Sequence, residues 1–212
     1  MKIASHRFEE AAERALRDER LQGAMRNVGT SFTLRMQNGF ARVADPEGLR
    51  KRAQAVKERS LANLPFLLET LELKVQEAGG QVHWARTGKE ARQIVKDLAK
   101  QHGVKSIIKG KSMVGEEIGL NQDLIDEGLD VFEADLGEFI IQLAGEPPSH
   151  IIGPAIHKTK EQIAELFSEK FGVPHLETPE ELTMVAREQL RERFLRADMG
   201  ITGANMAIAE TG

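Results

Sequence analysis

Ionisable and turn-forming residues are concentrated in residues 135–157, which read DLGEFIIQLAGEPPSHIIGPAIH. Segments of this composition commonly line a cleft, where loops on a rigid scaffold hold polar groups. Glu138 is the candidate catalytic residue, because a carboxylate close to Glu133 and Asp135 can acquire a pKa suited to general acid–base chemistry. The alternative is structural: Asp135 and Glu138 would then only cap the short helix that follows.

A second group of candidates lies in the KGKS sequence at residues 109–112, between a predicted strand and a predicted helix. Backbone N–H groups at such a turn can hold an anion, and ammonium groups add positive charge. We therefore predict Lys109, Lys111 and Ser112 as ligand-binding residues, the alternative being a plain solvated turn. A nucleoside triphosphate P-loop is excluded, because Lys105 stands where that motif requires its first glycine.

Asn205 is the remaining ligand-binding candidate, in a Gly-Ala-Asn sequence that permits close approach of the backbone to a ligand or to a neighbouring helix. His150 and His157 do not have the spacing of a metal site, so we predict structural roles for them and no metal. The chain has no cysteine, which excludes disulfides and cysteine-held zinc or iron–sulfur clusters within these residues.

Hydrophobic periodicity and capping sequences predict the elements that position these residues. Helices are predicted at 6–26, 46–78, 88–101, 116–127, 160–171 and 179–195. Pro65 should break the second of these helices near Leu64. Strands are predicted at 82–84, 104–109, 129–133, 149–152 and 206–208, and residues 27–44 are predicted to be irregular.

Strands that alternate with helices predict the α/β class, with a mostly parallel sheet flanked by helices. Residues 1–80 are predicted to form an N-terminal helical extension, and residues 81–212 the α/β domain. The final residues read as a strand and a turn that lead toward a further strand. We therefore expect the chain to be a piece of a longer protein, with the domain incomplete at its C-terminus.

Composition places the 212-residue chain among globular proteins that need no membrane span. No signal-peptide pattern is seen at the N-terminus, so a cytoplasmic location is expected. Residues 1–60 carry 13 Lys/Arg and 8 Asp/Glu, while the rest of the chain carries 16 and 25. A basic front could contact an acidic partner or simply be solvated. Aromatic residues make up only 5%, which argues against nucleic-acid binding by base stacking.

Three stretches together resemble the LUD domain of the lactate utilization protein B family, the iron–sulfur subunit of a bacterial L-lactate oxidation system. They are KGKSMVGEEIGLN at 109–121, the 35 residues from EADLGEF to AELF at 133–167, and RADMGITGANMAIAETG at 196–212. The NLPFLLETLE sequence also fits, so the resemblance covers nearly the whole chain. It implies a fold similar to ribose-5-phosphate isomerase, glucosamine-phosphate deaminase and CoA transferases, with a cleft at the carboxyl ends of the strands.

The resemblance further implies oxidation of L-lactate to pyruvate with other subunits of the lactate utilization system. It implies two [4Fe–4S] clusters for electron transport, held by cysteine motifs in a C-terminal region that these residues lack. The chain itself would then supply a site for a small carboxylate or a surface for subunit assembly, and would be inactive as an oxidoreductase alone. Two alternatives stay open: a freestanding enzyme like a sugar-phosphate isomerase or CoA transferase, and a non-catalytic docking module.

Overall fold

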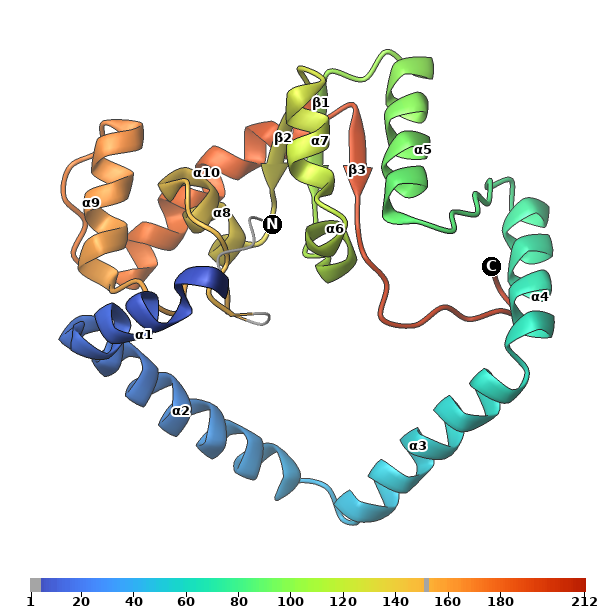
Figure 1. Ribbon diagram of the computed structural model, residues 1–212, viewed down its shortest axis with the longest axis horizontal. Coiled ribbons are helices and arrows are strands. Elements are labelled where there is room, and N and C mark those ends of the chain that lie inside the picture. The colour runs from blue at the N-terminus through green and yellow to red at the C-terminus, as the bar shows by residue number, and fades with distance from the viewer. Residues whose placement is uncertain (1–4, 151–152) are drawn as a thin grey trace. The chain divides into compact units, whose positions relative to one another are not determined.

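The computed structural model describes residues 5–150 and 153–212 (Figure 1). The chain divides into two compact units. The sheet unit comprises Met1–Gly29 and Thr87–Gly203, and the helical unit comprises Thr30–Arg86 and Ala204–Gly212. The predicted division at residue 80 between a helical extension and an α/β domain stays a prediction.

A three-stranded parallel sheet forms the centre of the sheet unit. Its strands β1 (Ser106–Lys109), β2 (Asp130–Glu133) and β3 (Met199–Ile201) are arranged in the order β2-β1-β3. Lys109 is paired with Glu133 on one side and with Ile201 on the other, so the carboxyl ends of all three strands meet at one edge. Helices flank this parallel sheet, which confirms the α/β class.

Asp198 positions β3 beside β1. Its Oδ2 accepts the backbone N–H of Lys105 at 2.9 Å and that of Ser106 at 3.0 Å. These two hydrogen bonds, with the charge of Lys105, lower the pKa of the Asp198 carboxyl, although slight desolvation opposes them. A single aspartate therefore sets the register of a strand that lies more than 90 residues from its partner in the sequence.

Capping residues begin several helices of the sheet unit where the sequence predicts. The Thr87 side chain accepts the N–H of Glu90, and complete capping boxes join Thr159 to Gln162 and Thr178 to Glu181. The elements of this unit are η1 (Ser5–Arg7), α1 (Phe8–Arg17), α5 (Gly88–Gln101), α6 (Met113–Glu117), α7 (Leu120–Asp126), α8 (Leu136–Ala144), α9 (Lys160–Phe171) and α10 (Pro179–Arg196).

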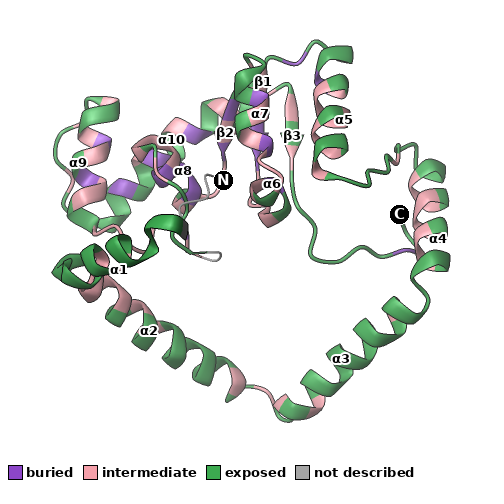
Figure 2. Ribbon diagram, in the orientation of Figure 1, coloured by how far each residue is buried: buried purple, intermediate pink, exposed green. Residues whose placement is uncertain are grey.

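Buried apolar residues of the sheet unit fall into two clusters (Figure 2). One lies between α8, α9 and α10. There the Phe139 and Phe171 rings are stacked with 6.2 Å between their centres, and the Phe167 ring meets Phe171 edge-on with 5.4 Å between the centres. The other joins α5 and α7 to the sheet through Leu124, Ile107 and neighbouring residues. The two clusters together hold α8 and the strand ends in fixed positions.

The helical unit contains the second half of α2 (Glu19–Phe40), together with α3 (Pro46–Ala62) and α4 (Leu64–Glu77). The Asp45 side chain caps α3 by accepting the N–H of Gly48 at 2.8 Å, with Pro46 at the first helical position, as predicted. The break at Asn63, before Pro65, is also confirmed. None of the residues described in these three helices is buried.

Several predicted elements are wrong. Residues 27–44 are predicted to be irregular, but residues 27–40 are the continuation of α2. Gly29, Asn38 and Gly39 have low helix propensity, which weakens an exposed helix without breaking it. Residues 82–84 and 206–208 do not form strands: an apolar alternation makes an extended chain, but a strand also needs a hydrogen-bonded neighbour. The strand near the C-terminus is β3 instead.

The predicted helix at 116–127 is split into α6 and α7, because Gly119 adopts a left-handed φ of 68° between them. In the predicted strand at 149–152, Ser149 and His150 form a bend, and Ile151 and Ile152 lie outside the described residues. Over the described ranges 5–150 and 153–212, no helix is both long and apolar enough to span a bilayer.

The aromatic cluster gives a direct test of the core. Phe167 is fully buried, so Phe167→Ala should lower the free energy of unfolding by about 3–5 kcal/mol. Phe194→Ala on the neighbouring α10 is the matched control: this residue is 51% exposed, so the change should stay within about 0.5 kcal/mol. Urea denaturation followed by circular dichroism measures both. Equal losses in the two variants would contradict this account of the core.

Candidate functional site

A buried lysine lies at the carboxyl edge of the sheet. Lys109 ends β1 and is completely inaccessible to solvent. Its Nζ lies 2.9 Å from Oε1 of Glu133, the last residue of β2, and 3.5 Å from Oε1 of Glu116 on α6. The register of the parallel strands produces the first contact, since it pairs Lys109 with Glu133 directly. A charge buried this deeply requires such partners.

Side chains from two helices hold the Glu133 carboxylate and its backbone. Asn121 of α7 donates a short hydrogen bond from Nδ2 to Glu133 Oε1. Gln142 of α8 accepts the Glu133 N–H through Oε1 at 3.1 Å and donates from Nε2 to the Val131 carbonyl at 2.7 Å. The second carboxylate oxygen, Glu133 Oε2, is buried and has no hydrogen bond with Asn121 or Gln142.

Asp135 and Glu138, which the sequence offers either as caps or as site residues, have different roles. Asp135 caps α8: its Oδ1 accepts the N–H of Gly137 at 3.0 Å and that of Glu138 at 3.2 Å. The Glu138 side chain is only 4% exposed. Burial raises its pKa from 4.5 to about 7, and the charge of Glu133 and a hydrogen bond with it add to this, while Lys109 and Lys111 oppose it.

Unsatisfied polar atoms mark this cluster. Within residues 5–150 and 153–212, and with both carboxyls ionised, the buried side-chain oxygens without a hydrogen-bond partner are Asn121 Oδ1, Glu133 Oε2 and Glu138 Oε2. A proton on Glu138 lets this side chain donate to Glu133. Buried polar atoms in folded proteins almost always have partners, so an exception calls for an explanation such as a bound molecule. All three atoms belong to residues that surround Lys109, and a ligand that donates hydrogen bonds would satisfy them.

The other predicted ligand-binding residues are placed differently. Ser112 caps α6 through a hydrogen bond from the Gly115 N–H at 3.2 Å, so its hydroxyl has a structural role. Lys111 is partly buried and lies close enough to Glu138 to lower its pKa. Asn205 belongs to the helical unit, where it is exposed, and its predicted role stays untested.

The loops that follow β1 and β3 lie against each other. The Gly110 N–H donates to the Ile201 carbonyl at 2.7 Å. At Gly203 an added Cβ would lie 3.0 Å from Ser112 Oγ and 3.4 Å from the Lys111 carbonyl, so there is little space for a side chain. Glycine at this position lets the backbone approach the KGKS turn, and the close contact is with protein.

His150 and His157 take part in local hydrogen bonds. His150 Nδ1 accepts the Gly153 N–H at 3.2 Å, and His157 contacts Ser149 and Glu146. Among the described residues, no three His, Asp or Glu side chains are grouped as they would be around a metal ion. Sequence reasoning missed the pairing of Lys109 with Glu133 and the part played by Asn121, which only the strand register and α7 bring together.

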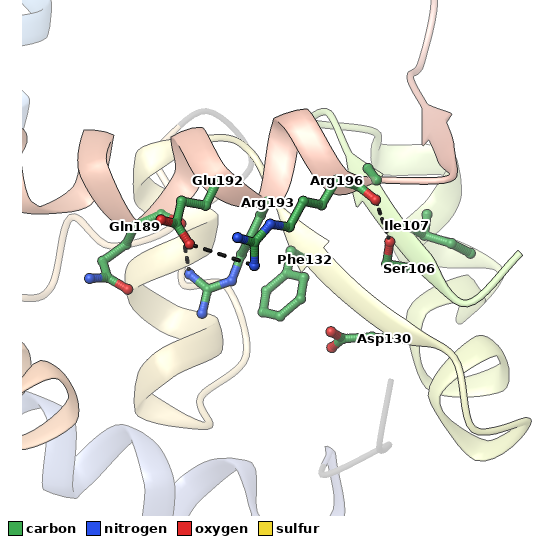
Figure 3. A pocket seen from close by; sticks show the side chains of 9 residues that line it. Ser106, Ile107, Asp130, Phe132, Gln189, Glu192, Arg193 and Arg196 are labelled. Carbon is green, nitrogen blue, oxygen red and sulfur yellow. Dashed lines mark hydrogen bonds and ion pairs between the residues drawn. The ribbon is translucent and has the colours of Figure 1, made fainter.

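An open cavity of about 360 Å³ lies at the opposite, amino ends of β1 and β2 (Figure 3). The Arg193 guanidinium lies 4.2 Å from the centre of the Phe132 ring. Arg196 and Glu192, which also line the cavity, form an exposed ion pair with 3.9 Å between their nitrogen and oxygen atoms. The buried atoms without partners lie at the other edge of the sheet, so we assign the candidate site to the cluster around Lys109.

The raised pKa of Glu138 makes the stability of the fold depend on pH. The unfolded carboxyl titrates near 4.5 and the folded one near 7, so its contribution is complete below pH 4.5 and is lost as the pH rises through 7. Glu138→Gln should therefore raise the free energy of unfolding above that of the wild type, and this gain should be up to about 3 kcal/mol larger at pH 8 than at pH 5.

Urea unfolding of Glu138→Gln and of the wild type at both pH values measures this difference. Glu165→Gln, at an exposed position on α9, is the control and should show no such difference. Carbon NMR of the labelled Glu138 carboxyl reports the same titration directly. A carboxyl that titrates near 4.5 would refute the electrostatic description of the cluster.

Comparisons with known proteins address the family. The model of the LUD domain matches residues 68–212. Lactate utilization protein B of Bacillus licheniformis is 42% identical over 213 aligned residues, which cover 100% of this chain and 45% of that protein. The proteins of the same name from Bacillus subtilis and Lysinibacillus sphaericus are 42% and 41% identical. The chain thus spans about half the length of these curated relatives. No solved structure matches it. Because the LUD model matches well over half of its residues, the chain belongs to the LUD domain family.

Proposed function

We propose that this chain is the LUD-domain part of a protein that acts in lactate utilization, and that the cluster around Lys109 binds a small carboxylate such as L-lactate. The similarity to proteins named lactate utilization protein B supports the first part. The observation that carries the second part is the group of buried oxygens without partners beside a buried lysine and a glutamate whose pKa is near 7.

The cluster has chemically distinct parts that suit a 2-hydroxy acid. The ammonium group of Lys111, near Glu138, would hold the carboxylate of the ligand. The unpartnered oxygens of Asn121 and Glu133 would accept a hydrogen bond from its hydroxyl group. Glu138 would exchange the hydroxyl proton, because a group with a pKa near the working pH can both give and take protons.

Oxidation of L-lactate to pyruvate also removes the hydrogen on Cα together with two electrons, and these residues do not accept them. The two [4Fe–4S] clusters implied by the resemblance need thiolate ligands, and the chain contains no cysteine. The residues present therefore do not fit such a cluster. In this proposal the chain binds and positions the ligand and moves a proton, and the electrons pass to groups held by other residues.

Growth on lactate tests the proposal. Lys111→Ala and Glu138→Gln, introduced together into the chromosomal gene, should lower lactate oxidation by about 100-fold or more and prevent growth on L-lactate. Growth on pyruvate should be unchanged. The matched control pair is Lys100→Ala with Glu165→Gln, two exposed residues outside the cluster. Normal growth on lactate, with the altered protein present at its usual level by immunoblot, would rule out the assigned site.

A freestanding isomerase or CoA transferase is the second candidate, because a buried glutamate with a pKa near 7 is also suited to proton abstraction beside a carbonyl. The purified chain, incubated with sugar phosphates or with acyl-CoAs and a free acid, should then convert them, and Glu138→Gln should not. Absence of turnover by the wild type would dismiss this candidate while leaving the lactate proposal intact.

Helix α3 supports a role in assembly with other subunits. The described residues of this helix are all unburied, and it carries Arg50, Lys51, Arg52, Lys57 and Arg59 against two glutamates. A single exposed helix has little stability in water without a packing partner. An acidic surface on another subunit of the lactate utilization system would supply both packing and charge complementarity.

Charge reversal in α3 checks this assembly role. Arg52→Glu with Arg59→Glu should reduce co-purification of the other lactate utilization proteins from lactate-grown cells at least ~10-fold. Arg187→Glu with Arg191→Glu, exposed on α10, should leave it unchanged. Equal recovery from both double variants would mean that α3 is not the assembly surface.

A further inference from the structure

A second cluster of ionisable side chains lies in the connection between α8 and α9, separate from the residues around Lys109. His157 Nδ1 lies 2.8 Å from Ser149 Oγ, and His157 Nε2 lies 2.7 Å from Glu146 Oε2. The imidazole thus bridges a hydroxyl group and a carboxylate. Lys158 Nζ makes a short ion pair with the other carboxylate oxygen, Glu146 Oε1.

The charges fix the direction of the hydrogen bonds in this cluster. Burial tends to raise the pKa of Glu146, but hydrogen bonds from Lys158 and His157 and the positive charge of Lys158 lower it below its ordinary value. The ionised carboxylate can only accept, so His157 Nε2 carries the proton that it donates to Glu146. In the neutral ring, Nδ1 then has its lone pair directed at the Ser149 hydroxyl.

The Ser149 hydroxyl has a proton available for this lone pair. The Pro154 carbonyl lies 2.9 Å from Ser149 Oγ and is a competing acceptor. That carbonyl already accepts the Ser149 backbone N–H at 3.0 Å, so it does not depend on the hydroxyl. The nitrogen of His157 has no such second donor among the hydrogen bonds of the described residues. The Ser149 hydroxyl is therefore better placed to donate its hydrogen bond to His157 Nδ1.

We propose that Ser149 is a nucleophilic serine, with His157 as its general base and Glu146 as the positioning residue, and that it accepts acyl groups from esters. Nucleophile and base within hydrogen-bond reach, with a third group behind the base, are the arrangement that activates serine on unrelated folds. No Gly-x-Ser-x-Gly sequence is present, and the hydrogen bonds alone identify the three residues.

The reaction balances within these residues. Ser149 Oγ forms a bond to the acyl carbon while its proton moves to His157 Nδ1. The bond from that carbon to the leaving alkoxide breaks, and the alkoxide takes the proton from the imidazolium. Water then hydrolyses the acyl-serine by the same route, which releases the acid and restores the hydroxyl.

Local structure keeps the nucleophile accessible and the base fixed. Ser149 is exposed and follows Pro147 and Pro148, whose rings restrict the backbone before it. The His157 side chain is only 19% exposed and is held at both ring nitrogens. Because the imidazole is fixed before a substrate arrives, little ordering is needed for the proton transfer.

An alkyl fluorophosphonate is the probe, since Ser149 Oγ would bond to phosphorus and expel fluoride while His157 takes the proton. The purified full chain should gain one adduct by intact mass, mapped to Ser149 by peptide sequencing. Ser149→Ala should abolish the adduct, and His157→Asn should slow labelling about 100-fold or more. Ser168→Ala is the matched control, because that hydroxyl contacts the Pro174 carbonyl and should not be needed.

Glu146 has its own pair of variants. Glu146→Gln should slow labelling, and Glu146→Asp should restore part of the rate, which separates positioning of the base from a general effect on folding. Circular dichroism confirms that each variant is folded. An unlabelled wild-type chain, beside a serine hydrolase that reacts in the same tube, would overturn the proposal. Labelling of His157→Asn at the wild-type rate would overturn it as well.

Discussion

The ion pair between Lys109 and Glu133 is the contact on which the carboxyl edge of the sheet depends. Both side chains are almost wholly removed from water, and each is the partner that makes the other tolerable there. Loss of one partner from such a pair costs about 3–5 kcal/mol, because an uncompensated charge stays behind. The pair therefore fixes the relative position of β1 and β2 and defines the electrostatic environment of every group around it.

Helix α8 connects this charged edge to the apolar core. Along nine residues it places Glu138 in the cluster, Phe139 among the aromatic rings between the helices, and Gln142 against β2. These directions follow from the helical repeat, which turns successive side chains by about 100°. Asp135 begins the helix and so sets the phase of all three. Charge, packing and strand contacts are thus coordinated by the start of one short helix.

Local signals in the sequence account for much of this structure. Threonine and aspartate caps, Pro46 and the break before Pro65 act over a few residues and were predictable from them. Glu138 was identified because its segment is dense in ionisable residues. The sequence alone does not distinguish it from Asp135, which caps the helix, because that distinction depends on the tertiary burial of Glu138. The position of β3 depends on Asp198 reaching Lys105 and Ser106, and the contact of Ser149 with His157 depends on a loop conformation. Neither has a local pattern.

Gln142 has a consequence for the growth of the sheet. β2 is an edge strand, and the Val131 carbonyl and the Glu133 N–H are the groups on its outer side that the Gln142 amide satisfies. One side chain thus stands in for a segment of neighbouring strand, donating and accepting as that strand would. An edge occupied in this way resists pairing with foreign strands, which is how many β-sheets avoid aggregation. Any additional strand is consequently directed to the β3 side, so the sheet has a built-in direction of extension.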